Sequence, residues 1–273
     1  MSAHPAPRRK AGGAPEHIVI TGASGGLGRA LAEAYAVPGR LLSLAGRDAP
    51  RLEQAAAACM SRGAEVSTRI IDVTNADAME EWLSARDAAR PVDLLVSSTG
   101  IGGDQVVPGP SGETGEQANR IFAINTLGAV NAVTPLLPSM VVRGKGHIVL
   151  IGSVSGLIGM PQSPAYCASK SAVHIYGDSL RRLVRQRGVG VTVVMPGFID
   201  TPMSRSLDMP RPFCWSAEKA ARRIVRDVAR GARRSIFPWP LRFVIGLQNY
   251  APVAATDWVM QLTTRGWQNA ADR

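Results

Sequence analysis

Short apolar runs rich in Val, Ile and Leu alternate along the chain with longer segments of helical periodicity. Runs that are both short and continuous indicate strands buried on both faces of a sheet. Because helical segments separate them, the strands are expected to run parallel, joined by right-handed crossovers in a doubly wound α/β fold. The expected strands are residues 17–21, 41–46, 65–73, 92–98, 147–153 and 190–197.

The segments between these strands predict helices, and no repeat or linker divides the chain. The expected helices are residues 27–37, 50–63, 76–89 and about 116–142, followed by a helix that carries Tyr166 and Lys170. We therefore expect a single Rossmann-like domain over residues 16–234.

The two ends of the chain depart from this pattern. Residues 1–15 are rich in Pro, Gly, Ala and Arg and have no apolar core, which predicts a disordered leader rather than a signal peptide. Residues 235–273 are apolar and rich in Trp and Pro, but Arg242 and Asp257 interrupt them. This C-terminal extension is expected to pack on the domain or on a partner subunit. Peripheral contact with a membrane is the alternative.

The chain of 273 residues carries a formal net charge of +10 and three cysteines. The scattered cysteines lack metal-ligand spacing, which argues against a disulfide framework or a metal site and fits a reducing compartment. The basic residues are dispersed over expected helix faces, and the few aromatic residues do not alternate with them, so no nucleic-acid partner is expected. No uninterrupted apolar run reaches the roughly 18–20 residues needed to span a bilayer. We expect a soluble, cytoplasmic protein.

A glycine-rich stretch, "VITGASGGLGRALAEA", joins the first expected strand to the first helix. Gly22, Gly26 and Gly28 allow a tight turn and a close approach of the backbone to a ligand. The N-terminus of the following helix offers free N–H groups and a positive dipole end, which suit a pyrophosphate. Glycines alone are a weak signal, but their place between strand and helix favours a dinucleotide site over a purely structural turn.

The second expected strand ends in "LAGRD". Sites that bind NAD carry an acidic residue near this point, which accepts hydrogen bonds from the ribose hydroxyls. Here Gly46 is followed by Arg47, whose guanidinium can pair with a 2′-phosphate through two N–H donors. This favours NADP(H) over NAD(H). The alternative is that Asp48 binds the ribose and Arg47 is a surface residue.

The stretch "SPAYCASKSAV" places Tyr166 and Lys170 four residues apart, on one face of a helix. A structural pair is one interpretation, and a phenol made reactive by a neighbouring cation is the other. His174 lies one turn further on and is expected to be a packing or surface residue. Cys167 is expected to be a small core residue.

Taken in order, these motifs resemble the short-chain dehydrogenase/reductase family over about residues 16–205. The motifs that carry the resemblance are Thr21-Gly22-x-x-x-Gly26-x-Gly28, Asp72-Val73, Asn125, Ser153, Tyr166-x-x-x-Lys170 and Pro196-Gly197.

The resemblance implies an oxidoreductase that moves hydride between a nicotinamide and a carbonyl or secondary alcohol. It implies that Tyr166 is the acid/base, that Lys170 lowers the pKa of the phenol and holds ribose hydroxyls, that Ser153 binds the substrate oxygen, and that Asn125 holds a water. The implied cofactor contacts, together with those expected from the residues themselves, are Gly22, Ser24, Gly26, Leu27, Gly28, Arg47, Asp72, Val73, Gly100, Tyr166, Lys170, Pro196, Gly197, Ile199 and Thr201.

The chain also departs from the family pattern. After the fourth strand the family often has Asn-Asn-Ala-Gly, where this chain has Ser97-Ser98-Thr99-Gly100, so an amide that ties neighbouring strands is absent. The chain also lacks the Asp-Gly-Gly that is typical near the end of many tetrameric members. A homo-oligomer is still expected, either a dimer or a tetramer.

The stretch "TPMSRSLDMPRPFCW" is expected to form a lid over the substrate. Its apolar residues suggest a hydrophobic alcohol or ketone, and Arg205 and Arg211 are candidates to accept an acidic group on it. The candidate pocket residues are Met160, Phe198, Met203, Leu207, Met209, Phe213 and Trp215. A non-catalytic, NADP(H)-sensing protein of the same fold is the alternative function.

Overall fold

The structure is a computed structural model that describes residues 14–102, 113–161, 163–206, 211–241, 251–258 and 260. Residues 1–13 of the predicted leader lie outside these ranges, as do Leu207 and Met209 of the predicted pocket and most of the predicted C-terminal extension.

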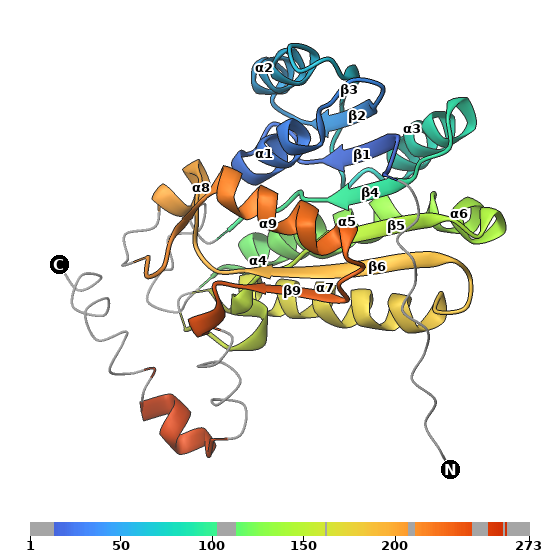
Figure 1. Ribbon diagram of the computed structural model, residues 1–273. Helices are drawn as coiled ribbons and strands as arrows, with labels where there is room; N and C mark the ends of the chain where they lie inside the picture. The colour runs from blue at the N-terminus through green and yellow to red at the C-terminus, as the bar shows by residue number, and fades with distance from the viewer. Residues whose placement is uncertain are drawn as a thin grey trace.

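A seven-stranded parallel sheet forms the centre of the molecule (Figure 1). The strand order is β3-β2-β1-β4-β5-β6-β9. The strands are β1 (His17–Thr21), β2 (Leu41–Gly46), β3 (Glu65–Ile70), β4 (Leu94–Ser97), β5 (Gly146–Ile151), β6 (Val189–Pro196) and β9 (Arg234–Phe237). The order reverses between β1 and β4, and in open α/β sheets ligands bind beyond the carboxyl ends of the strands at such a switch point.

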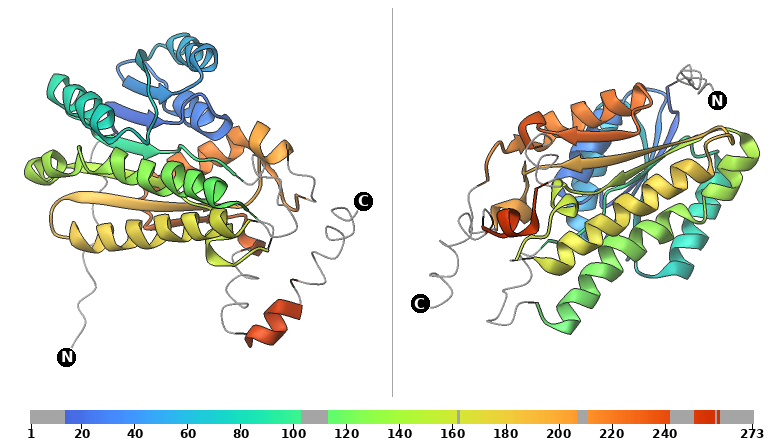
Figure 2. Two further views of the ribbon diagram at one scale, coloured as in Figure 1. Left: turned by 180° about the vertical axis from the view of Figure 1, so that it is seen from behind. Right: turned by 90° about the horizontal axis from the view of Figure 1, so that it is seen from below.

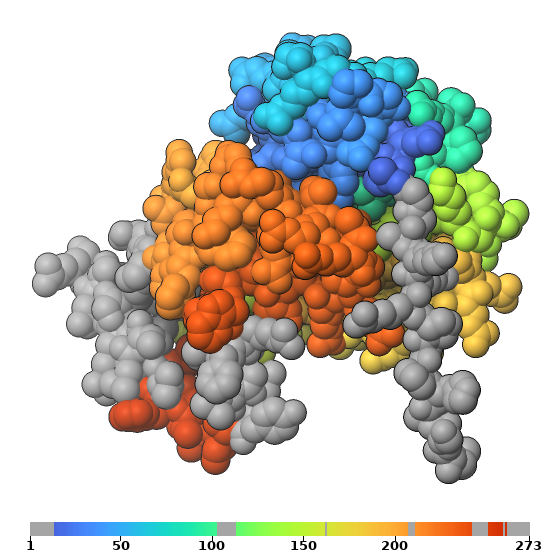
Figure 3. All heavy atoms as spheres, in the orientation of Figure 1, coloured from blue at the N-terminus to red at the C-terminus, as the bar shows by residue number. Residues whose placement is uncertain are grey.

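Helices cover both faces of the sheet, as Figure 2 shows most plainly in its second view. One face packs against α1 (Gly26–Tyr35), α2 (Ala49–Met60) and α9 (Ala217–Ala229). The other packs against α3 (Ala76–Ala89), α4 (Gly115–Phe122), α5 (Gly128–Val133), α6 (Leu137–Arg143) and α7 (Pro164–Leu183). In the space-filling view, α9 lies beside α1 on the first face (Figure 3).

Strand β1 shows why the apolar runs are continuous. Ile18 and Ile20 point into the core beneath α1 and α9, whereas Val19 points into the core beneath α5 and α7. All three side chains are fully buried. Complete burial of such a side chain contributes roughly 1.5–3 kcal/mol, so both faces of the strand need apolar residues. The doubly wound fold expected from the sequence is confirmed.

The single helix expected over 116–142 is divided. A π-turn, η2 (Ala123–Leu127), separates α4 from α5, and Pro135 lies in the break between α5 and α6. Proline cannot donate the helical hydrogen bond, which explains the second break. By length and composition, Gly115–Arg143 could cross a membrane. Its residues Ile121, Ala132 and Met140 are instead buried against the sheet, as in a core helix.

The sequence analysis missed strand β9. It has only four residues and begins with Arg234 and Ser235, so it shows no apolar run. It pairs with β6 in parallel register, Val194 opposite Ser235. Residues 235–237, which the sequence assigns to the C-terminal extension, therefore lie in the sheet.

Candidate active site

The turn between β1 and α1 is built so that only glycine fits at two places. Gly22 has a φ of +70°, and a Cβ there would lie 2.9 Å from the Thr99 Cα. A Cβ on Gly28 would lie 2.1 Å from the Gly22 carbonyl oxygen. The N-cap residue Gly25 caps no N–H group, and the first turn of α1 has no acidic residue. The free N–H groups and the dipole of α1 therefore suit a pyrophosphate, which is the group expected there.

Two other segments approach this turn. A Cβ on Gly26 would lie 2.7 Å from the Thr201 Cγ2, and a Cβ on Gly46 would lie 2.6 Å from the Ser24 Oγ. The end of β2 and Thr201, in the segment that follows β6, thus lie beside the turn. Leu27 is partly buried against the core beneath α1.

Arg47 and Asp72 stand together at the ends of β2 and β3. The Arg47 Nη1 lies 3.5 Å from the Asp72 Oδ2, and both side chains are about half exposed. Burial opposes ionisation of Asp72, but hydrogen bonds from the Thr74 backbone and hydroxyl, with the charge of Arg47, outweigh it and lower the pKa of the carboxyl. Arg47 therefore has a loose partner and free donors at the predicted ribose end of the site. Val73 packs against Gly128.

Lys170 is a buried cation beneath the site. Its side chain is 5% exposed, and its Nζ donates a hydrogen bond to the Ile151 carbonyl oxygen at 3.1 Å. The Nζ lies 5.9 Å from the centroid of the Tyr166 ring, and a Cβ on Gly100 would come within 3.0 Å of it. Burial lowers the pKa of Lys170 to about 8. Among the described residues, no carboxylate forms an ion pair with it, so a neighbouring group that gains negative charge would be stabilised strongly.

Asn125 lies in the π-turn and is 1% exposed. Its Oδ1 accepts from the Ile101 N–H at 2.8 Å, and its Nδ2 donates to the Ile101 carbonyl oxygen and to the Ser169 Oγ, both at 3.0 Å. The side chain therefore ties the segment after β4 to α7, beside Lys170. Both amide hydrogens are used in these bonds, so a water held by Asn125 would have to use its backbone.

Ser153 follows β5 and caps a short 3₁₀ turn, η3 (Val154–Leu157). Its Oγ accepts from the Ser155 N–H at 3.1 Å, and its own N–H donates to the His174 Nε2 at 3.3 Å. Three elements thus carry the four predicted catalytic residues. Ser153 follows β5, Asn125 lies in the π-turn, and α7 carries Tyr166 and Lys170. These elements pack together at the carboxyl edge of the sheet. His174 is buried, so of its two expected roles the structure shows packing and not a surface position. Its hydrogen bond with Ser153 was not predicted from the sequence.

The residues after β6 contribute mainly packing. The Gly197 N–H donates to the Phe237 carbonyl oxygen at 2.8 Å, and a Cβ there would lie 2.6 Å from the Leu241 Cδ1. Pro196 and Ile199 are buried, Ile199 against the core beneath α1 and α9. This strand end is therefore held by β9 and the residues after it, an arrangement that the sequence analysis did not foresee.

The two arginines expected to accept an acidic substrate group are occupied by a protein carboxylate. Asp200 binds Arg205 through two contacts of 2.8 and 2.9 Å, and the Arg211 Nη1 lies 3.5 Å from Asp200. The sequence analysis did not reveal this shared partner, which lies several residues upstream. A single carboxylate offsets one of the two positive charges, and the contact of Arg211 is as long as that between Arg47 and Asp72.

The described candidate pocket residues differ in their exposure. Met160 and Phe198 are partly buried. Trp215 stacks on Phe237 of β9 with ring centroids 5.0 Å apart, so it belongs to the core. Phe213 is 57% exposed, and Met203 is also exposed. These two side chains remain available to an apolar ligand.

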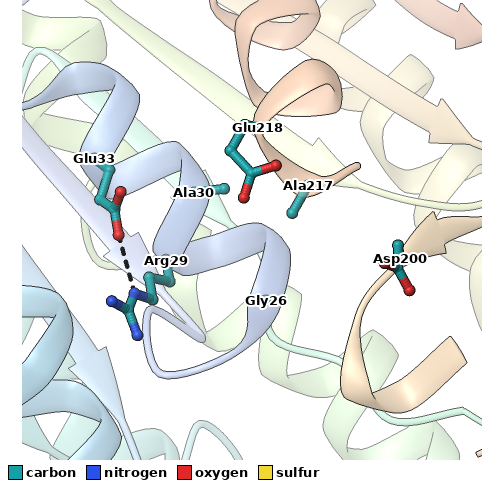
Figure 4. A pocket seen from close by; sticks show the side chains of 7 residues that line it. All are labelled: Gly26, Arg29, Ala30, Glu33, Asp200, Ala217 and Glu218. Carbon is teal, nitrogen blue, oxygen red and sulfur yellow. Dashed lines mark hydrogen bonds and ion pairs between the residues drawn. The ribbon is translucent and has the colours of Figure 1, made fainter. Parts of the chain in front are cut away.

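A groove of about 370 Å³ lies beside the N-termini of α1 and α9 (Figure 4). Three carboxylates, those of Glu33, Asp200 and Glu218, line it, and its one cation, Arg29, pairs with Glu33 at 2.9 Å. Arg62 also pairs with Glu33, and Arg205 pairs with Asp200, so salt bridges offset two of these three carboxylates. The dinucleotide site is assigned to the glycine-rich turn because that turn combines the glycines with the free N–H groups of α1. The groove shares Gly26 with it.

A doubly wound parallel sheet with a glycine-lined phosphate turn at its first strand defines an α/β protein that binds a dinucleotide. The model of the family described as short chain dehydrogenase matches residues 16–211. The chain belongs to the short-chain dehydrogenase/reductase family. It is an oxidoreductase of a family that uses a nicotinamide cofactor and acts on small molecules.

Relatives and solved structures agree with this assignment. An uncharacterized oxidoreductase of Myxococcus xanthus is 35% identical over 82% of this chain and 87% of its own length. An uncharacterized oxidoreductase of Staphylococcus saprophyticus is 36% identical over 74% of this chain and 83% of its own. The crystal structure of levodione reductase is 26% identical, with a TM-score of 0.73, covering 81% of this chain and 95% of that one. A family member from Burkholderia phymatum, solved with NAD, shares the fold at 24% identity and a TM-score of 0.76, over 86% of this chain and 92% of that one.

Proposed function

We propose that the protein is an NADP(H)-dependent carbonyl reductase or alcohol dehydrogenase acting on a hydrophobic substrate. The observation that carries the proposal is the buried Lys170 beside Tyr166, at the sheet edge where the glycine-rich turn fits a pyrophosphate. A buried cation without a carboxylate partner is costly, and such groups are concentrated at functional sites.

A nicotinamide cofactor held at this site would supply hydride to a carbonyl carbon or accept it from an alcohol. In reduction, Tyr166 donates its proton to the substrate oxygen, and in oxidation it takes that proton back. A free phenol has a pKa of about 10, so it is a poor base at neutral pH. The ammonium of Lys170 stabilises the phenolate and so lowers the pKa of the Tyr166 phenol. Lys170 also holds the ribose hydroxyls of the cofactor, and Asn125 fixes the neighbouring backbone.

Ser153 donates a hydrogen bond to the substrate oxygen and orients it toward Tyr166. The remaining predicted cofactor contacts fall into three groups around the sheet edge. The glycine-rich turn with Ser24 and Leu27 would hold the phosphates. Asp72, Val73 and Gly100 are proposed for the adenine and ribose side, and Pro196, Gly197, Ile199 and Thr201 for the nicotinamide side.

The preference for NADP(H) rests on Arg47. Its guanidinium is half exposed at the end of β2, where Gly46 takes the place of an acidic residue, and its contact with Asp72 is long. Binding of a 2′-phosphate would replace that weak contact with charge-assisted hydrogen bonds.

Arg47→Ala is expected to raise the Kd of NADPH by roughly tenfold or more, the loss of one charge-assisted interaction of about 1.5–3 kcal/mol. The Kd of NADH should change by less than about twofold, because NADH has no 2′-phosphate. Fluorescence titration of both cofactors measures this, with Arg51→Ala, a nearby exposed arginine on α2, as the matched control. An equal loss for NADH and NADPH would remove Arg47 from 2′-phosphate recognition and leave Asp48 as the candidate ribose ligand.

We further propose that the protein forms a homo-oligomer through α4, the π-turn and α7, which lie side by side (Figure 2). Phe122, Leu127, Ile175 and Leu183 expose apolar side chains on these neighbouring elements. Exposed apolar side chains on neighbouring helices suit an association surface.

Ile175→Glu is expected to reduce the assembly to a smaller species, since it buries a carboxylate in that contact. Light scattering after size-exclusion chromatography measures the mass. The control is Ile70→Glu, an equally exposed isoleucine on the edge strand β3. A wild-type monomer, or an unchanged mass for Ile175→Glu, would contradict the proposed surface.

The remaining proposals concern the organisation and setting of the chain. We propose that the catalytic domain begins near residue 16 and includes β9, so that it ends a few residues beyond the expected boundary at 234. The protein is proposed to be cytoplasmic.

Peripheral membrane contact through residues 235–273 would be tested by liposome flotation of the full chain. The alternative function, a non-catalytic NADP(H) sensor, has no support from the comparisons, because the relatives are named as oxidoreductases.

A further inference from the structure

His174 lies on α7, four residues after Lys170, and is 3% exposed. Its Nε2 accepts a hydrogen bond from the Ser153 backbone N–H at 3.3 Å. Because Nε2 accepts, the ring proton of the neutral imidazole is assigned to Nδ1. The Nδ1 is buried and has no hydrogen-bond partner among the described residues. Within the described part of the chain, the polar contact of the ring is therefore with the backbone of Ser153.

The loop around Ser153 is shaped to admit this ring. A Cβ on Gly152 would lie 2.3 Å from the His174 Nε2, and a Cβ on Gly156 would lie 2.6 Å from its Cε1. Real Cβ atoms do not approach so closely, so any other residue at 152 or 156 would displace the ring or the loop. Glycines thus flank Ser153 on both sides, and both leave room for the same imidazole.

Two neighbouring N–H groups of this loop have backbone acceptors. The Gly152 N–H donates to the Val194 carbonyl oxygen at 2.7 Å, and the Gly156 N–H donates to the Ser153 carbonyl oxygen at 3.0 Å. Of these three N–H groups, that of Ser153 is the one bound by a side chain from another element. Loss of that acceptor would leave a buried donor unsatisfied, which costs roughly 1–3 kcal/mol and favours movement of the loop.

The charge state of the ring suits an acceptor. Burial, then the nearby positive charges of Lys170 and Arg234, lower the pKa of His174 to about 4, although the charge of Asp178 opposes the change. The imidazole is therefore neutral near pH 7, and its Nε2 lone pair is free to accept.

We propose that His174 is a positioning residue for the reaction: by accepting the Ser153 N–H, it holds the loop so that the Ser153 hydroxyl is aimed at the substrate oxygen. The proposal rests on the role of Ser153 in the proposed function. His174 touches neither substrate nor cofactor in this account. The competing explanation is that the ring only fills the space between α7 and the loop.

The test compares two replacements of similar length. His174→Gln keeps an oxygen acceptor, and His174→Met keeps the volume without a strong acceptor. We expect His174→Met to lower kcat by about tenfold or more, equivalent to about 1.4 kcal/mol. The Kd of NADPH should stay within about twofold, and His174→Gln should recover most of the lost kcat. Amide hydrogen exchange of residues 153–156 should be faster in His174→Met than in wild type.

A double-mutant cycle with Ser153→Ala separates positioning from packing. If His174 acts through the Ser153 hydroxyl, His174→Met has little further effect on kcat in the Ser153→Ala background. An equal loss in both backgrounds, or equal losses for His174→Met and His174→Gln, would overturn the proposal. Undiminished turnover of Ser153→Ala alone would instead count against the proposed function itself.

If His174→Met does not fold, the proposal can still be tested by measuring which ring nitrogen of His174 is protonated in the wild-type protein. Nitrogen NMR of the wild-type imidazole is expected to show a protonated Nδ1 and an unprotonated Nε2 near neutral pH. A proton on Nε2 would be incompatible with acceptance of the Ser153 N–H and would overturn the proposal without any variant.

Discussion

Tyr166→Phe is expected to lower kcat by roughly a hundred- to ten-thousandfold, the range that general acid–base catalysis contributes. The variant removes the proton that the substrate oxygen needs, while the ring still packs against the core beneath α7. The Kd of NADPH should therefore stay within about twofold and the midpoint of thermal unfolding should change little. Steady-state kinetics, cofactor titration and thermal denaturation together measure these quantities.

Tyr176→Phe provides the matched control, because Tyr176 is a partly buried tyrosine on the same helix and packs against the same core. This variant should keep wild-type turnover. Normal turnover of Tyr166→Phe would remove Tyr166 from the chemistry. A parallel loss in Tyr176→Phe would show that the helix, and not the phenol, had been disturbed.

The second large effect concerns the buried ammonium of Lys170. Its pKa is lowered by burial from 10.5 to about 8. Between these values the unfolded chain binds a proton that the folded chain has released, so the free energy of unfolding rises with pH across this window. A shift of this size corresponds to about 3 kcal/mol of stability at the top of the window. Below about pH 8 this contribution is absent, because Lys170 is charged in both states.

The measurement is a denaturant titration of wild type and of Lys170→Met at pH about 8 and about 10. Burial raises the pKa of the Tyr35 phenol and that of the Cys59 thiol, to about 11 for the thiol, so these groups lower the stability of both proteins as pH rises. The difference between the two proteins therefore isolates Lys170. Wild type should gain stability relative to Lys170→Met as pH rises, and a constant difference would show that Lys170 is not desolvated.

The pH range over which Lys170 titrates also matters for turnover. Near pH 7 it is still mainly protonated, so it can stabilise the Tyr166 phenolate. Lys170→Met should accordingly lose turnover as well as its pH-dependent stability. The two effects arise from the same buried charge.

The strands and the site edge were predictable because their signals are local. In β1 every residue from Ile18 to Ile20 must be apolar, and the turn after it needs glycine at Gly22 and Gly28 whatever surrounds it. Each of these requirements fixes the residue type at one position, so it can be recognised in the sequence alone. The spacing of Tyr166 and Lys170 on one helix face is local in the same sense.

The features that the sequence did not reveal depend on partners far along the chain. Strand β9 is stable because β6 supplies its hydrogen bonds and because Ser235 bonds to Asp227 of α9. Asp200 pairs with Arg205 and, more loosely, with Arg211, and the His174 ring accepts a hydrogen bond from the backbone N–H of Ser153. Long-range pairings of this kind leave no periodic pattern, so residue type alone could not separate a substrate ligand from an internal ion pair.

The most direct test of the central claim is the consumption of NADPH by the wild-type protein in the presence of a panel of hydrophobic ketones and aldehydes. The absorbance of the reduced nicotinamide reports turnover. We expect turnover with at least one carbonyl compound, a higher kcat/KM with NADPH than with NADH, and no turnover above background in Tyr166→Phe. Tight binding of NADPH with no turnover of any compound, in either direction of the reaction, would contradict it and indicate a protein that binds the cofactor without using it.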